Sequence, residues 1–209
     1  PVAYILGQQG FWKLDLEVAP HTLIPRPETE MLVEAALELV PAFAESQVLD
    51  LGTGTGAIAL ALASERPVWV VTAVDRVLEA VALAERNRQR LQLNNAKVLS
   101  SHWFDSVEGK RFDLIISNPP YIAAEDPHLV TGDVRFEPNS ALVAGADGLD
   151  DLRLIIDQAP AHLNPEGWLL LEHGYDQGAA VRDLLSSHGF EKIQTRRDLG
   201  DHERITFGR

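Results

Sequence analysis

The sequence predicts an α/β domain built around a mostly parallel sheet of seven strands, and three observations support this fold. After Glu45, short apolar runs rich in β-branched residues alternate with longer runs that have helical spacing. Glycines occupy positions 52, 54 and 56, where the first of these strands gives way to a helix. An acidic residue, Asp75, ends the next strand. Strands separated by helices of this length form βαβ units and hence a parallel sheet.

The N-terminal part is expected to be a short β-hairpin followed by a helix. Apolar and polar residues roughly alternate between positions 11 and 24, which predicts a hairpin or a strand pair. Pro27, followed by Glu28 and Glu30, has the features of a helix start, because proline suits the first turn and acidic residues suit the positive end of the helix dipole. We expect residues 1–45 to pack against the main domain, residues 46–209.

The remaining elements follow in the order that a parallel sheet requires. Helices are predicted at 57–65, 78–91, 152–162 and 177–188, and strands at 47–51, 68–74, 97–100, 112–117, 168–172, 190–195 and 204–207. The last two strands are joined by a short connection, which indicates an antiparallel C-terminal pair. Residues 121–149 are rich in proline and glycine and lack clear periodicity. We predict a long ordered loop there, and loops of this length in compact domains are usually functional or disordered.

Composition narrows the class of protein. With 18 Lys plus Arg against 31 Asp plus Glu, the formal net charge is −13, which argues against a protein that holds nucleic acid by charge alone. The absence of cysteine excludes disulfides, thiolate metal sites and cysteine nucleophiles. No apolar run is long enough to span a membrane, and no signal peptide opens the chain, so a cytoplasmic location is expected. Because the chain begins at Pro1, we expect it to be the body of a longer protein.

The glycine loop and Asp75 predict a site for a nucleoside cofactor. Gly52-Thr53-Gly54-Thr55-Gly56 lies between a strand and a helix, and glycines allow a sharp turn and a close approach to a ligand. In such a site, Asp75 accepts hydrogen bonds from ribose hydroxyls. The glycine spacing differs from that of the dinucleotide fingerprint, and the loop lacks the lysine of a phosphate-binding loop. S-adenosylmethionine fits better, and a tight turn without a ligand is the structural alternative.

A second motif, Asn118-Pro119-Pro120-Tyr121, follows directly after a predicted buried strand. Two prolines remove two backbone donors, which leaves neighbouring carbonyl oxygens free to face a ligand. The side-chain oxygen of Asn118 and the carbonyl of Pro119 are expected to accept the two hydrogens of a planar NH₂ group, with Tyr121 stacked on its plane. This arrangement suits methyl transfer to an amide or aminopurine nitrogen, in which catalysis is mostly positioning and electrostatics. A proline-rich turn that only closes the strand is the alternative.

Together these motifs resemble the class I S-adenosylmethionine-dependent methyltransferases, and the flanking sequence resembles one family in particular. Stretches 23–30, 132–138 and 170–174 are similar to those of the HemK/PrmC protein-glutamine methyltransferases, which modify the glutamine of the GGQ motif in peptide chain release factors. The likeness covers essentially the whole chain. It implies a Rossmann-like fold, S-adenosyl-L-methionine as cofactor, and class 1 release factors as protein substrates. The resemblance also implies an N-terminal helical domain, which we expect to lie outside this sequence.

The resemblance also implies roles for individual residues. Gly52, Thr53, Gly54, Thr55, Gly56 and Asp75 are expected to bind the cofactor, with Trp103 at the adenine. Asn118 is expected to lie between cofactor and substrate, and Pro119, Pro120 and Tyr121 to form the glutamine pocket, with Asn118, Pro119 and Tyr121 carrying the catalysis. One position departs from the family, because His102 stands where an aspartate is usual; the loop backbone or Asp105 are candidates to replace its contact with the adenine.

Three functions are weighed on this basis. Methylation of a release-factor glutamine is the leading hypothesis. Methylation of an adenine or guanine amino group in nucleic acid would use the same Asn118 motif, but the charge of −13 counts against it. A module that binds the cofactor without catalysis is the third, and the intact motif disfavours it. No metal site is expected, since the histidines lack metal-ligand spacing, and for His173 a structural role is the simpler explanation.

Overall fold

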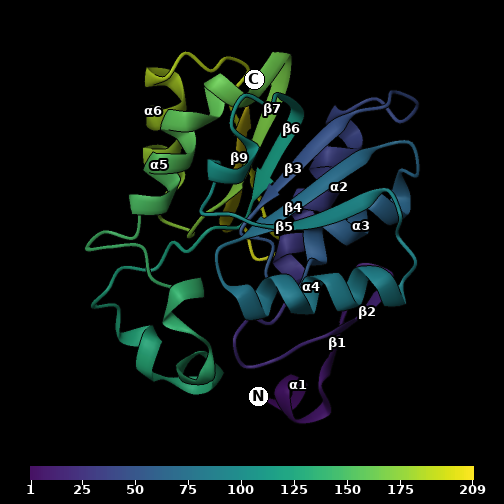
Figure 1. Cartoon of the computed structure of the whole chain (residues 1–209). Coiled ribbons are helices and arrows are strands. Elements are labelled where there is room, and N and C mark those ends of the chain that lie inside the picture. Colours follow the sequence, from purple (N-terminus) through teal and green to yellow (C-terminus); the bar gives the residue numbers. More distant parts are fainter.

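The computed structural model describes all 209 residues. Its centre is a seven-stranded sheet in the order β5-β4-β3-β6-β7-β9-β8, with helices on both sides (Figure 1). The strands are β3 (Gln47–Leu51), β4 (Val70–Asp75), β5 (Ala96–Ser100), β6 (Phe112–Ser117), β7 (Leu163–Glu172), β8 (Gln194–Arg197) and β9 (Glu203–Gly208). The first five strands pair in parallel, and β9 is antiparallel to both β7 and β8. The predicted fold class is therefore confirmed.

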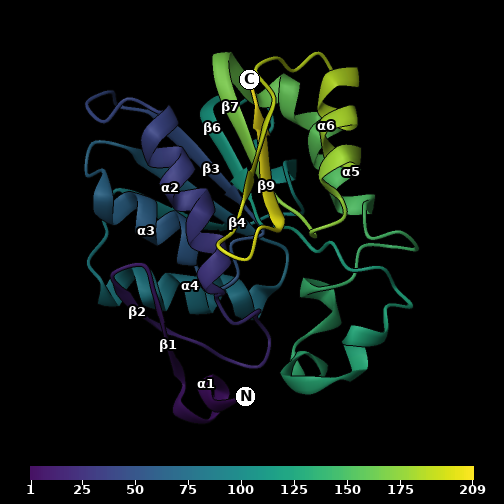
Figure 2. The same ribbon diagram turned by 180° about the vertical axis from the view of Figure 1, so that it is seen from behind.

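Helices cover both faces of the sheet because its strands are apolar on both sides. The helices are α1 (Val2–Leu6), α2 (Glu30–Leu39), α3 (Ala57–Glu65), α4 (Leu78–Arg90), α5 (Asp150–Gln158) and α6 (Gly178–Ser187). Val48 of β3 packs in one apolar cluster with α2 and α3, whereas its neighbour Leu49 packs in a second cluster with α5 and α6. This alternation is the two-residue period of a strand that is buried on both faces. Figure 2, seen from behind, shows α2 and α3 against the sheet.

The N-terminal residues form a separate two-stranded sheet against α4. The strands β1 (Gln8–Phe11) and β2 (Leu14–Glu17) are antiparallel, so the predicted hairpin exists, but it lies several residues earlier than residues 11–24. The buried amide of Asn87 on α4 accepts a hydrogen bond from the backbone N–H of Glu17 at 2.8 Å. Arg86 also pairs with the Glu17 carboxylate. These contacts attach the hairpin to the main domain.

Two predicted strands are placed differently in the structure. The strand predicted at 190–195 is wrong at its start, because β8 begins only at Gln194. Lys192 has φ 51°, in the left-handed region, which interrupts an extended chain. The strand predicted at 168–172 is longer, since β7 begins at Leu163, with a register shift opposite Phe112 and Leu114. Both differences arise at bends in the chain, where the alternation of apolar and polar residues does not indicate where a strand begins.

Residues 122–149 form an ordered loop without an α-helix or a sheet strand. Its regular pieces are the 3-10 helices η3 (Pro127–Val130), η4 (Gly132–Phe136) and η5 (Asn139–Ala141). The two ends of the loop meet in a parallel bridge between Ile122 and Val143. The bridge brings η5 back toward the end of β6, where the Asn118 motif begins. No helix of the structure is long and apolar enough to cross a membrane.

Candidate active site

The glycine loop connects β3 to α3 through three residues in the left-handed region. The φ angles of Gly52, Gly54 and Gly56 are 70°, 57° and 88°. A Cβ atom on Gly52 would lie 3.3 Å from the ring of Trp103, so the loop also needs glycine because the indole packs against it. Glycine adopts these angles at no steric cost, whereas other residues would be strained. The alternating glycines thus bring the loop close to the end of the next strand.

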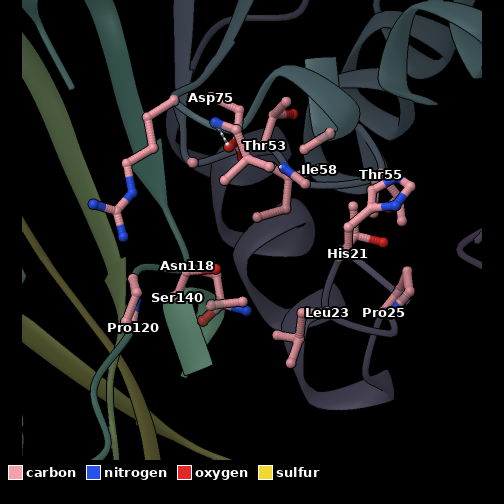
Figure 3. A pocket seen from close by; sticks show the side chains of 18 of the residues that line it. His21, Leu23, Pro25, Thr53, Thr55, Ile58, Asp75, Asn118, Pro120 and Ser140 are labelled. Carbon is pink, nitrogen blue, oxygen red and sulfur yellow. Dashed lines mark hydrogen bonds between the residues drawn. The ribbon is translucent and has the colours of Figure 1, made fainter. Parts of the chain in front are cut away.

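Asp75 fixes the loop at the carboxyl end of β4. One carboxylate oxygen accepts a hydrogen bond from the backbone N–H of Gly54 at 2.9 Å, and the other accepts from the N–H of Val77, also at 2.9 Å. Each oxygen keeps a further lone pair, and the side chain lines a cavity (Figure 3). The two hydrogen bonds therefore fix the Asp75 carboxylate at the cavity wall, and its contact with a ribose stays a prediction.

Asp50 was not among the predicted site residues, and the structure shows that its carboxylate supports the glycine loop through hydrogen bonds. Its side chain is completely buried, and one oxygen accepts hydrogen bonds from the Thr53 hydroxyl at 2.7 Å and from the Ala59 N–H at 3.2 Å. Burial raises the pKa of Asp50 to about 7. In the sequence, only its position two residues before Gly52 indicated a role in the glycine loop. The contacts tie the loop to the start of α3.

A cavity opens above these residues at the carboxyl ends of the parallel strands. Together with its open mouth it takes in about 960 Å³. The loop between β3 and α3, Asp75 after β4, Trp103 after β5 and Asn118 after β6 all contribute to its wall. His21, Leu23 and Pro25 close the side nearest the hairpin, as Figure 3 shows. Every predicted cofactor residue except Gly56 lines this cavity.

A second cavity of about 500 Å³ lies next to the first. Asn118, Leu23 and Ala141 line both cavities, so Asn118 forms part of the wall between them. Pro119 and Tyr121 line the second cavity, whereas Pro120 lines the first. The structure therefore divides the three residues that the resemblance implies for the glutamine pocket. The prolines alternate because successive residues of an extended chain point to opposite sides.

A buried carboxylate, Glu172, organises the second cavity. It lies at the end of β7 and is only 3% exposed. It accepts hydrogen bonds from the Thr29 hydroxyl at 2.7 Å and from the Tyr121 hydroxyl at 3.0 Å. Thr29 in turn accepts a long hydrogen bond of 3.5 Å from the side-chain nitrogen of Asn118. Burial raises the pKa of Glu172 to about 7. The Tyr121 hydroxyl is thereby engaged, while Tyr121 lines the second cavity, and its stacking on a substrate stays a prediction.

Two of the sequence stretches behind the family resemblance meet beside this cavity. The guanidinium of Arg26 pairs with the carboxylate of Glu137, whose side chain is completely buried. The other oxygen of Glu137 accepts a hydrogen bond from the backbone N–H of Ile24 at 3.0 Å. The long loop at 122–149 is thereby fastened to the segment before α2. Arg26 itself lines the second cavity.

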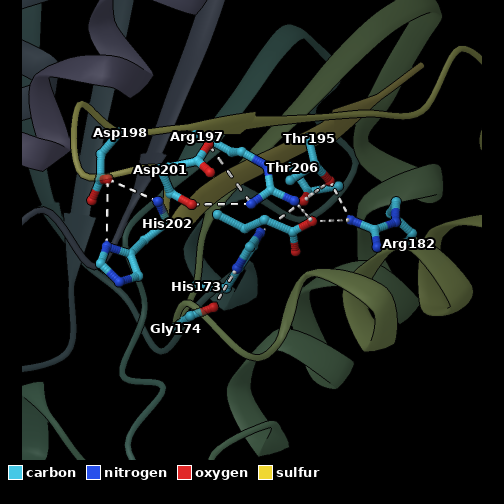
Figure 4. Close-up of polar contacts among 10 residues, drawn as sticks. His173, Gly174, Arg182, Thr195, Arg197, Asp198, Asp201, His202 and Thr206 are labelled. Atoms are coloured by element: carbon cyan, nitrogen blue, oxygen red, sulfur yellow. Dashed lines mark hydrogen bonds and ion pairs between the residues drawn. The ribbon is translucent and has the colours of Figure 1, made fainter.

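His173 and the C-terminal strands form a polar cluster (Figure 4), and His173 lines neither cavity. One ring nitrogen of His173 contacts the carbonyl of Gly174 at 2.8 Å, and the other contacts the Thr206 hydroxyl at 2.7 Å. The ring is fully buried, and burial lowers its pKa. Since both nitrogens are already engaged, His173 has a structural position. The structure holds no group of three or more side chains arranged as metal ligands.

Comparison with known proteins agrees with this geometry. Residues 28–136 match the family model described as "Methyltransferase small domain". The release factor glutamine methyltransferase of Pseudomonas aeruginosa is 72% identical over the whole of this chain, which spans 75% of that protein. The enzyme of the same name from Salmonella typhimurium is 57% identical, with the same coverage.

A solved structure supports the same assignment. The release-factor-specific protein-(glutamine-N5) methyltransferase of Alicyclobacillus acidocaldarius is 28% identical, with a TM-score of 0.56 over 88% of this chain and 93% of that one. Sequence identity, family model and fold therefore agree on the family. The chain belongs to the family of release factor glutamine methyltransferases.

Proposed function

We propose that this protein transfers a methyl group from S-adenosyl-L-methionine to the side-chain amide nitrogen of the GGQ glutamine in class 1 peptide chain release factors. The observation that carries the proposal is the position of Asn118 in the wall between two cavities. A methyl donor and a methyl acceptor must approach each other at a single point. A residue that lines both cavities can contact the methyl donor in one and the methyl acceptor in the other.

The first cavity fits the proposed cofactor. The glycine loop offers backbone that a ligand can approach closely, and the fixed carboxylate of Asp75 can accept hydrogen bonds from ribose hydroxyls. The indole of Trp103 gives an aromatic surface in the same cavity. When bound, the cofactor supplies a methyl group on a positively charged sulfur. The residues named here bind it and hold its orientation.

The hydrogen bonds around Glu172 determine how Asn118 presents its amide. The ionised carboxylate of Glu172 only accepts, so the Thr29 hydroxyl donates to it and can accept from the nitrogen of Asn118. The side-chain oxygen of Asn118 is then left to accept a hydrogen bond from a substrate. The backbone carbonyl of Pro119 accepts no hydrogen bond from the protein and offers a second acceptor.

Two such acceptors suit an amide nitrogen as the attacking atom. Its lone pair is delocalised into the carbonyl group, which makes it a poor nucleophile. The oxygens of Asn118 and Pro119 would hold both N–H bonds, fix the direction of the nitrogen and stabilise the positive charge that develops on it. Catalysis by this site is therefore a matter of orientation and electrostatics.

Mass spectrometry of a release factor tests the proposal directly. After incubation with the enzyme and S-adenosylmethionine, we expect a gain of one methyl group located on the GGQ glutamine. A release factor in which that glutamine is replaced by alanine is the matched control and should gain none. Equal labelling of both proteins, or labelling of DNA or RNA with none on the release factor, would contradict the proposal.

A further inference from the structure

The sheet order determines which end of the first cavity receives the base of the cofactor. This step relies on the proposed function, because it assumes that S-adenosylmethionine occupies that cavity. In the order β5-β4-β3-β6, Asn118 follows β6 at one end, and Trp103 follows β5 at the other. The methyl group must face Asn118, and Asp75, after the intervening β4, is placed for the ribose. The adenine therefore lies at the β5 end, beside Trp103.

Asp151 supplies a carboxylate at that end of the cavity. Asp75 and Asp151 are the two acidic side chains that line the cavity, and Asp75 is placed for the ribose. Asp105, the side chain that the sequence offered for this role, does not line the cavity, and neither does His102. His102 and Asp105 face each other at 3.9 Å, with side chains 55% and 75% exposed. Ser101 also lines it, but its hydroxyl already bonds to the Trp103 carbonyl and the Ser106 N–H.

The Asp151 carboxylate is half-buried, whereas that of its neighbour Asp150 pairs with Arg153 and is 64% exposed. Partial burial raises the pKa of Asp151, while the charge of Arg76 and a hydrogen bond from the Trp103 side chain favour its charged form. A carboxylate has about four lone-pair sites, so Asp151 can accept further hydrogen bonds beside that one. A partly desolvated carboxylate gains most from new N–H donors. The 6-amino group of adenine carries two N–H bonds, whereas a 6-oxo purine presents an oxygen that a carboxylate would repel.

The start of α5 is held firmly, which fixes the position of Asp151. The N–H of Asp150 bonds to the carbonyl of Ala144 at 3.3 Å, and Asp147 accepts from the N–H of Leu149 at 3.0 Å. Gly145 has φ 74°, and a Cβ atom there would lie 2.0 Å from the carboxylate of Asp150. The backbone hydrogen bond of Asp150 and the bond between Asp147 and Leu149 therefore define where α5 starts, and with it the place of Asp151.

We propose that Asp151 accepts a hydrogen bond from the exocyclic amino group of the adenine and makes the site selective for a 6-aminopurine cofactor. Asp151 is thus a specificity-determining residue contributed by α5, on the far side of the sheet from the glycine-loop helix α3. The proposal concerns cofactor binding and is independent of which substrate receives the methyl group.

Calorimetric binding of two nucleosides tests this role. S-adenosylhomocysteine carries the 6-amino group, and S-inosylhomocysteine carries a 6-oxo group in its place. We expect the unchanged protein to bind the adenosyl compound at least about tenfold more tightly, as the loss of a hydrogen bond to a charged group implies. Asp151→Ala should weaken binding of the adenosyl compound about tenfold. It should not weaken binding of the inosyl compound, which gains if the repulsion between its 6-oxo oxygen and the carboxylate is removed. Asp151→Asn, nearly the same size, should bind both compounds about equally.

Asp105→Ala is the matched control and should keep the original preference. The proposal is overturned if Asp151→Ala weakens both compounds equally, or if the preference is lost in Asp105→Ala and kept in Asp151→Ala. A protein that binds neither compound overturns both this inference and the proposed cofactor. If the preference depends on Asp151 but no release factor is methylated, the inference stands and only the proposed substrate fails.

Discussion

The charge of Glu172 controls the direction of a chain of hydrogen bonds that ends at Asn118. An ionised carboxylate accepts from Thr29 and Tyr121, and Thr29 can then accept from the nitrogen of Asn118. A protonated Glu172 can donate its own hydrogen to the Thr29 hydroxyl oxygen. The hydrogen of the Thr29 hydroxyl is then free to turn away from Glu172, for example toward Asn118. The orientation of the Asn118 amide would then no longer be fixed. Proton binding at a residue that touches no reacting atom thereby affects the proposed catalysis.

We predict that the maximal methylation rate rises with pH through about 7. Burial raises the pKa of Glu172 from 4.5 to about 7, so the ionised form accumulates only above that pH. Between pH 4.5 and 7 the folded protein holds a proton that the unfolded chain has released, so this group's contribution to stability falls as pH rises. Glu172→Gln should be slower and should lose the slope. The measurement is the initial rate at saturating cofactor between pH 6 and 8.

Asp50, whose pKa is also raised to about 7, provides the control for that profile. An Asp50→Asn variant should retain the slope, whatever its absolute rate, because Asp50 supports the glycine loop rather than Asn118. The prediction is contradicted if the pH profile becomes flat in Asp50→Asn and stays unchanged in Glu172→Gln. The titrating group would then be Asp50 and not Glu172.

At the same scale, Asn118→Ala should reduce kcat by about 100- to 1,000-fold, the usual effect of removing one group that stabilises developing charge. Binding of S-adenosylhomocysteine should change far less, since Asp75 and the glycine loop remain. Asn94→Ala, at an exposed position outside both cavities, is the control and should behave like the unchanged protein. Steady-state rates together with calorimetry separate the two effects. Equal losses in rate and in cofactor affinity would assign Asn118 to cofactor binding alone.

At the scale of elements, one buried ion pair helps to fasten the loop at 122–149 to the segment before α2. Arg26 comes from the segment before α2 and Glu137 from the end of η4, 111 residues later. The Glu137 side chain is fully buried, while that of Arg26 is 35% exposed. Removing one partner of a buried pair leaves an uncompensated charge. The loop closes the second cavity through Val134 and Leu142, so loosening it should open the proposed substrate site.

Arg26→Ala is expected to destabilise the protein by about 3 kcal/mol, the lower end for a broken buried pair. Amides of residues 122–149 should exchange hydrogen faster, whereas those of β3 and β6 should change only with global stability. Arg86→Ala, which breaks the exposed pair with Glu17, should cost less than about 1 kcal/mol. Hydrogen exchange with mass spectrometry checks both variants. Unchanged protection of the loop in Arg26→Ala would show that other contacts hold it.

At the scale of the whole molecule, the net charge of −13 bears on how the protein meets its proposed partner. A release factor acts on the ribosome and must face ribosomal RNA, so basic surface on it is expected. Opposite charges speed encounter, and salt screens them. We predict that the association rate falls about tenfold or more between 50 and 500 mM salt. Stopped-flow measurements test this, with a short uncharged glutamine peptide as the control; a rate insensitive to salt would contradict it.

The sequence by itself determined the fold class, the glycine loop with Asp75, and the location of Asn118 at the end of a buried strand. These features are local: strand period, glycine spacing and proline placement act within a few residues, and parallel strands bring their carboxyl ends to one edge. The bends at Lys192 and in the N-terminal hairpin could not be predicted from the sequence, because a positive φ on a non-glycine residue leaves no periodic pattern.

Only the tertiary structure decided which polar side chains support and complete the site. Thr29 and Glu172 are 143 residues apart in the chain, and Arg26 and Glu137 are 111 apart, yet each pair shares a short contact. Asp151 likewise reaches the first cavity only because α5 packs where it does. A carboxylate on a helix is usually solvated, and nothing in its neighbouring residues tells whether it will be buried or will face a ligand. That outcome depends on how distant elements pack, since burial and partners, not residue type, set the charge and the role of an acidic side chain.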